Sequence, residues 1–487
     1  MLRSLLFSLM FSGMVFLPVS GHQAQGNMPP LPPDAPLPID MPVPDGFEAD
    51  ARLMPPDSAA SESRPAFFLM PESELPHFVY RLDAQGAPQR VFGIGVFAPL
   101  LHPRYFQTYD QRHRRIFDEV LFDTLRPRFD QIYATFTYER ADVVRPAFYD
   151  SLRGSEAMIM GASHLPWWLR TRYAAEGDRL SFEEQLSLHE RIDRERLRER
   201  IQDVIRFAGG RNVILNLFDE PERGTASNLW HFTGDTARLM YELASPEVLV
   251  SLGLGPVGNS RGEGTGNALV WQRTGGTAEM AATVTSDAPL QRTTELSWEQ
   301  ILDIMMDEYR DAYDVLFINT YAFQIADPRR AGAVTRAMLH HPTIDRKKPV
   351  WIWFSAEQFR HRGEPEREMR NIRQQVFSAI ANEATGVLFY PDVRVNAESG
   401  RYDERLWHLV LRFAEELQHW KPVLEHGQPV TNFVSDELEW ILYRYRGANY
   451  LFAVNHSNRD IRLEAPVRVT IPAGGSGIFT SPYVSRG

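Results

Sequence analysis

The sequence predicts an α/β fold: a (β/α)8 TIM barrel followed by a small C-terminal antiparallel β-sandwich domain. Between about residues 91 and 427, eight strand-like stretches alternate with helical patterns. Beyond that point the helical patterns stop, and short strands separated by turn residues follow. One buried strand also ends abruptly at a group of carboxylates, and barrels carry their chemistry at such strand ends. An open doubly wound sheet is the alternative for the first part.

The composition is that of a globular protein with a large core. The chain has 487 residues, of which 43% are hydrophobic and 24% charged, and it has no cysteine. Disulfides and thiol catalysis are therefore excluded. The formal net charge is -11, and no basic cluster alternates with aromatic residues. Nucleic acid is not an expected partner.

The first residues suggest export. A basic start and the apolar run Leu5–Leu17, which is too short to span a bilayer, predict a signal peptide over residues 1–24. Residues 25–64 are rich in proline and predict a disordered spacer. We expect the catalytic barrel over 65–427 and the small β-sandwich domain over 428–487. The mature chain would have no membrane span and be periplasmic or extracellular in a bacterium; oligomeric state stays open.

Each barrel strand is predicted from a short run of apolar, β-branched or aromatic residues. The eight runs are Val91–Phe97, Gln131–Tyr138, Ala157–His164, Val213–Glu220, Val248–Leu254, Asp314–Tyr321, Pro349–Ser355 and Gly386–Pro391. The C-terminal strands are Glu439–Tyr445, Tyr450–Val454 and Val467–Ile471.

Helices are predicted from capping signals and apolar residues at helical spacing. Ser181 and Glu184 are expected to open one long helix that ends at Gly209-Gly210, and Ser297 and Gln300 to open another. Further helices are expected before His340-His341, through Met369–Ile380 and over Leu406–Trp420.

The fourth strand carries the clearest chemical signal. Pro221 cannot donate to a sheet ladder, so the strand should end there, leaving Asp219, Glu220 and Glu222 at its carboxyl end. An acidic turn exposed to solvent would give the same pattern. Glu357, the only carboxylate between Pro349 and Arg362, follows the seventh strand and offers a partner. Two carboxyl groups across a barrel mouth are what glycoside hydrolysis requires.

Polar and aromatic residues at other strand ends suit a sugar, which has apolar ring faces and many hydroxyls. The candidates for substrate binding are Asp219, His164, Trp167, Tyr321, Trp353 and Tyr390. Packing in the barrel core is the alternative role for Trp353, and a purely structural role is the alternative for His164.

With these residues the chain resembles the retaining (β/α)8 glycoside hydrolases of the clan A type. The resemblance implies that Glu220 is the acid/base, Glu357 the nucleophile, and Tyr321 a donor to that nucleophile. Two positions depart from the common pattern: Asp219 stands where most members have asparagine, and Tyr390 stands near a position where many have tryptophan. Sugar, linkage, and exo or endo action stay open.

Other chemistries fit less well. Gly253–Gly258 and Gly258–Gly262 match a dinucleotide and a serine-hydrolase motif, but no helix pattern follows either, which argues against a serine esterase. No His-Glu-x-x-His occurs, and we expect no metal or cofactor. The predicted function is a secreted retaining glycoside hydrolase acting on a β-linked polysaccharide or oligosaccharide. The alternative is a catalytically inactive polysaccharide-binding barrel in an export or biofilm assembly.

Overall fold

The computed structural model of the protein describes most of the chain beyond the predicted spacer. The described residues are 67–97, 124–125, 127–135, 157–161, 165, 169, 172–173, 182–207, 213–222, 232–245, 247–255, 269, 273, 296–320, 327–356, 364–390 and 404–482. The predicted signal peptide and spacer lie outside these residues, so their boundaries stay predictions.

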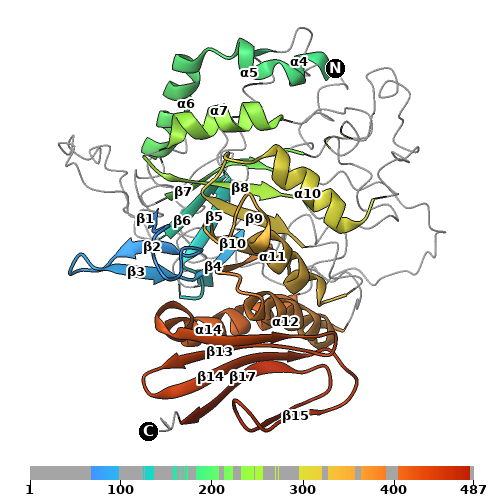
Figure 1. Ribbon diagram of the computed structural model, residues 1–487. Coiled ribbons are helices and arrows are strands. Elements are labelled where there is room, and N and C mark those ends of the chain that lie inside the picture. The colour runs from blue at the N-terminus through green and yellow to red at the C-terminus, as the bar shows by residue number, and fades with distance from the viewer. Residues whose placement is uncertain are drawn as a thin grey trace, which may run out of the picture.

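Eight parallel strands form a closed barrel at the centre of the molecule (Figure 1), which excludes the open doubly wound sheet. Every residue of the fifth, sixth and seventh barrel strands is buried, as their continuous apolar runs predict. The barrel strands are β4 (Gly93–Phe97), β5 (Gln131–Thr135), β6 (Ala157–Gly161), β7 (Val213–Asp219), β8 (Leu249–Leu254), β9 (Val315–Asn319), β10 (Val350–Ser355) and β11 (Gly386–Tyr390).

Trp351 fills the barrel interior near the amino-terminal ends of the strands. It is fully buried, and its ring stacks on Phe317 with centroids 5.5 Å apart. A β-carbon at Gly93 would lie 2.7 Å from this indole and one at Gly386 would lie 2.5 Å from it. The two glycines, on β4 and β11, therefore make room for the largest fully buried side chain among the described residues.

A three-stranded antiparallel sheet that the sequence did not predict lies against this end of the barrel core. It consists of β1 (Phe67–Leu69), β2 (Val79–Leu82) and β3 (Pro88–Val91). Phe67, Val79 and Val91 pack in one cluster with Trp351 and Leu388 of the barrel. The strand predicted over Val91–Phe97 is confirmed as β4 from Gly93 onward, but its predicted start is wrong because Val91 belongs to β3 of the small sheet.

The long helix predicted from Ser181 to Gly209-Gly210 is also wrong. The segment forms three shorter helices, α4 (Phe182–Leu186), α5 (Leu188–Arg191) and α6 (Arg194–Phe207). Asp193 interrupts the helix because its carboxylate accepts from the Arg196 backbone N–H at 3.1 Å and begins α6 anew.

The other helices surround the barrel, and the one between β7 and β8 was not predicted. Ser297 and Gln300 form the predicted capping box of α10. The remaining long helices are α7 (Gly234–Ala244), α10 (Trp298–Glu308), α11 (Arg330–His340), α12 (Pro365–Ala381) and α14 (Glu404–His426). Among the described residues, no helix is long and apolar enough to cross a membrane.

The C-terminal strands form antiparallel sheets beside α12 and α14 (Figure 1). One sheet has the order β12 (Gln428–Val434), β13 (Leu438–Tyr445), β14 (Ala448–Asn455) and β17 (Ser476–Pro482). A two-stranded ribbon, β15 (Ile461–Leu463) and β16 (Val469–Ile471), packs on the face of this sheet that carries Leu442 and Leu451. The opposite face meets the barrel helices, with Phe452 tilted against Phe377 of α12. The predicted antiparallel strands are thus confirmed, arranged as one sheet and one ribbon.

Candidate active site

Strand β7 ends in an irregular segment that sets the direction of the carboxylates. Asn216 pairs with Ser251 of β8, but the next paired residue, Phe218, matches Leu252, so Leu217 is an extra residue. Such a bulge changes which way the following side chains point. Phe218 packs outside the barrel on Phe232, with ring centroids 5.0 Å apart.

Glu220, immediately after β7, is bound to residues of β8 and β9. Its φ of 52° lies in the left-handed region, and its backbone N–H donates to Gly253 O on β8 at 2.7 Å. Its side chain is half-buried, and Oε1 accepts a hydrogen bond of 2.7 Å from Asn319 Nδ2 at the end of β9. Glu220 therefore lies at the carboxyl ends of the barrel strands, where the sequence predicted it, with its carboxyl held by an amide.

Glu222, in contrast, is buried and bonded to the backbone. It is fully buried, and Oε1 accepts from the Gly255 backbone N–H at 2.6 Å, which ties the end of β7 to the segment after β8. Burial and the nearby charge of Glu222 raise the pKa of Tyr309 well above its ordinary value. The Tyr309 hydroxyl donates to Phe232 O at 2.8 Å. A carboxylate bonded to the backbone in this way orders the segment after β8.

Asn319 was not identified from the sequence as a residue of the site. Its side chain is only 5% exposed, yet it is the last residue of an otherwise apolar strand. The signal was present, because a polar residue that ends a buried barrel strand has the same position in its strand as Asp219 has in β7.

Aromatic residues occupy the same end of the barrel on the other side. Tyr390 and Phe97, the last residues of β11 and β4, stack with centroids 4.8 Å apart and an interplanar angle of 23°. Both are half-buried. Trp353 is 5% exposed and meets Phe317 edge-on, so it belongs to the packed interior beneath the mouth. A contact between Trp353 and substrate stays a prediction.

Several predicted site residues cannot be placed. Asp219 ends β7, but its side chain lies outside the described part of the structure, as do His164, Trp167, Tyr321 and Glu357 entirely. The separation between the carboxyl groups of Glu220 and Glu357, which would distinguish retention from inversion, therefore stays a prediction.

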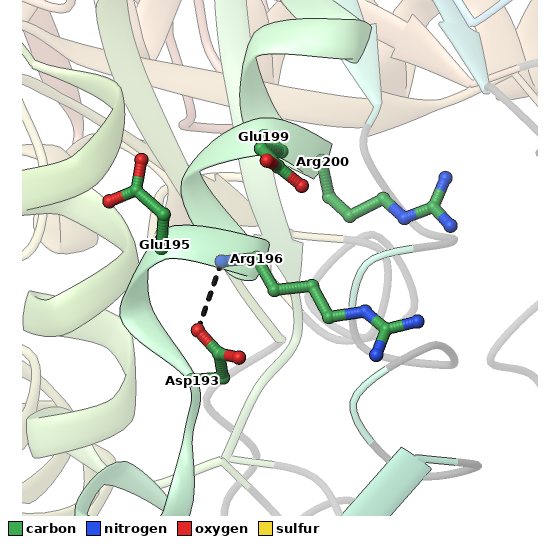
Figure 2. A pocket seen from close by; sticks show the side chains of 5 residues that line it. All are labelled: Asp193, Glu195, Arg196, Glu199 and Arg200. Carbon is green, nitrogen blue, oxygen red and sulfur yellow. Dashed lines mark hydrogen bonds between the residues drawn. The ribbon is translucent and has the colours of Figure 1, made fainter.

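The described residues contain no group of three or more histidine and carboxylate side chains that could hold a metal ion. A shallow pocket lies elsewhere, on the outer face of α6, where Asp193, Glu195, Arg196, Glu199 and Arg200 line it (Figure 2). These side chains are on a surface helix and are not part of the mouth of the barrel.

No family model and no curated protein matches the chain. Solved structures do match it, and those described here are glycoside hydrolases. A GH30 endoxylanase from Clostridium papyrosolvens is 11% identical, with 81% of this chain and 94% of that chain covered and a TM-score of 0.41. An Anoxybacillus alpha-amylase is 10% identical over 81% and 98% of the two chains, with a TM-score of 0.44. The exo-beta-1,4-mannosidase Op5Man5 from an Opitutaceae bacterium is 14% identical over 71% and 62%, with a TM-score of 0.38.

These neighbours are of the kind that the sequence resemblance predicted. Because their TM-scores lie below 0.5, they carry no argument about the activity of this chain, and the barrel is established by its own strand pairing.

Proposed function

We propose that the protein is a secreted retaining glycoside hydrolase that acts on a β-linked polysaccharide or oligosaccharide. The observation that carries the proposal is the position of Glu220 at the carboxyl end of a closed parallel barrel, with Oε1 bound to Asn319 Nδ2 at 2.7 Å. A carboxyl group held in this way is suited to exchange a proton with a bound ligand in a fixed direction.

In the proposed reaction Glu220 acts as the acid and base, and Glu357 acts as the nucleophile. Glu220 donates its proton to the glycosidic oxygen while the bond from that oxygen to the anomeric carbon breaks. Glu357 attacks the same carbon and forms a covalent glycosyl-enzyme. Glu220, now ionised, removes a proton from water as the water attacks that carbon and releases Glu357.

The remaining predicted residues would bind the sugar or assist the nucleophile. We assign Tyr321 as a donor to Glu357, and Asp219, His164 and Trp167 as polar and aromatic contacts. Tyr390, stacked on Phe97 at the mouth, offers a ring face to a sugar, and Trp353 would support it from within the barrel. We further propose residues 1–24 as a signal peptide, 25–64 as a spacer, 65–427 as the catalytic barrel and 428–487 as a β-sandwich domain.

A panel of β-linked polysaccharides and aryl β-glycosides tests the activity. We expect turnover of at least one substrate. With a 2-deoxy-2-fluoroglycosyl fluoride of the same sugar, mass spectrometry should find the sugar attached to the peptide that contains Glu357. Binding of a polysaccharide with no turnover of any substrate would instead support the inactive polysaccharide-binding barrel. Absence of both binding and turnover would overturn the two proposals.

A further inference from the structure

A hydrogen bond connects Asn319 to Glu220 at the mouth of the barrel. They stand at the ends of β9 and β7, with β8 between these strands. Asn319 Nδ2 nevertheless reaches Glu220 Oε1 at 2.7 Å, and the asparagine is only 5% exposed. The bond is therefore partly shielded from water, which strengthens a hydrogen bond to a carboxyl group.

The backbone on both sides of this bond is fixed. After Asn319, the Thr320 backbone N–H and hydroxyl both donate to Trp353 O, at 3.1 Å and 2.8 Å. On the other side, the left-handed backbone of Glu220 is held by its own N–H bond to Gly253 O. The amide therefore meets the carboxyl group between two anchored strand ends.

The chemistry of the bond distinguishes the two carboxyl oxygens. The amide nitrogen of asparagine can only donate, so Oε1 must act as an acceptor. When Glu220 is protonated, its carbonyl oxygen is the acceptor and its hydroxyl is the donor. The proton then belongs on Oε2.

We propose that Asn319 is a positioning residue that orients the Glu220 carboxyl group and directs its acidic proton to Oε2. This inference rests on the proposed function, in which Glu220 is the general acid. Its consequence is specific: without Asn319, Oε1 loses this donor and the proton is no longer directed to Oε2 by it, so reactions that need protonation of the leaving group lose most.

The structure provides a matched control. Asn382 is also buried, 4% exposed, and its Nδ2 donates to Glu439 Oε1 at 3.2 Å in the contact between α12 and the C-terminal sheet. Asn319→Leu and Asn382→Leu thus each remove a hydrogen bond from a buried asparagine to a glutamate, and only the first lies at the barrel mouth.

Kinetics on aryl glycosides with different leaving groups test the role. We expect Asn319→Leu to lower kcat roughly 10- to 100-fold for poor leaving groups, with KM changed less than about twofold, because a small misplacement of a reacting group has this cost. Dinitrophenyl glycosides, which leave without protonation, should keep nearly the wild-type kcat/KM, because kcat/KM reports the first step and Glu220 acts as base only in the second. Asn382→Leu should lower the melting temperature and leave the ratio of the two rates unchanged. An unchanged ratio in Asn319→Leu would overturn the inference.

A second measurement needs no substrate and separates this inference from the proposed function. Carbodiimide labelling of Glu220, followed by peptide mass spectrometry, should change severalfold in rate in Asn319→Leu and stay unchanged in Asn382→Leu. If the wild-type protein hydrolyses no glycoside but the labelling rate changes as expected, the proposed function fails and the positioning role of Asn319 holds. A labelling rate equal in all three proteins would overturn the positioning role.

Discussion

The indole of Trp351 on β10 lies against the backbone of Gly386 on β11, and these two residues are in register. Trp351 pairs with Gly386 directly, and a β-carbon on the glycine would stand 2.5 Å from the ring. Gly386→Ala should therefore force the ring or the strand to move and destabilise the protein by about 1–3 kcal/mol. Urea unfolding would measure the loss. Gly477→Ala is the control, because its nearest neighbour would be 3.6 Å away, and equal stability of the two variants would contradict the packing argument.

Glu220→Gln should remove the proposed acid while keeping the acceptor for Asn319. We expect turnover of substrates with poor leaving groups to fall roughly 10²- to 10⁴-fold, the usual contribution of a general acid. Activated aryl glycosides should lose far less in the first step of the reaction. Values of kcat/KM for both substrate types, which report the first step, give the comparison. Equal losses on both would argue against Glu220 as the acid/base.

Glu357→Gly should abolish hydrolysis because no covalent glycosyl-enzyme can form. Azide, which is small enough to enter the space left by the side chain, should restore turnover of an activated substrate and yield a glycosyl azide of inverted configuration. Product analysis by NMR would establish that configuration. If the variant keeps near-normal turnover, the nucleophile lies elsewhere, and Glu263 is the next carboxylate to test.

His77 should make the protein sensitive to acid. Burial, assisted by the charges of Arg346 and Arg90, lowers the pKa of His77 from 6.5 to about 4. The unfolded chain therefore binds this proton more readily, so the associated stability is complete above pH 6.5 and is lost as the pH falls toward 4.

The His77→Gln variant removes this titration. Between pH 7.5 and pH 4.5, the variant should lose roughly 2 kcal/mol less of its free energy of unfolding than the wild-type protein loses. Urea unfolding at the two pH values measures the difference. A His77 variant with the same pH dependence as wild type would refute the assignment.

Deletion of residues 25–64 is expected to leave the melting temperature and the hydrolysis of a soluble substrate nearly unchanged, because the segment has little to bury. Deletion of residues 25–91 should lower the melting temperature strongly, since it also removes the β1–β3 sheet from the core around Trp351. A large loss from the shorter deletion would show that the predicted spacer packs against the fold.

The eight barrel strands could be predicted because each is a short run of residues buried on both faces, and such runs are visible without tertiary information. The β1–β3 sheet was missed because its strands are only three or four residues long and are stabilised by the barrel core. The break at Asp193 was missed because Ile192 keeps the apolar spacing of a helix while the carboxylate of Asp193 competes for the backbone.

The candidate site was predictable only in part for a related reason. The carboxylates at the end of β7 mark the site, but the sequence does not distinguish Glu220, held by a side chain from β9, from Glu222, which is buried against the Gly255 backbone. That distinction depends on the bulge at Leu217 and on contacts between strands far apart in the chain. Asn319, likewise, gains its importance only from the strand order of the closed barrel.

The contacts of the β1–β3 sheet constrain the order in which the chain can fold. Phe67, Val79 and Val91 are synthesised first, but their partners Trp351 and Leu388 are made about three hundred residues later. Such distant contacts must wait for the long intervening chain, and they form slowly. The first strands therefore cannot reach their native packing until β11 has been made, and fragments that stop before β11 leave this apolar layer exposed. The barrel is thus completed and the β1–β3 sheet is buried in the same late step of folding.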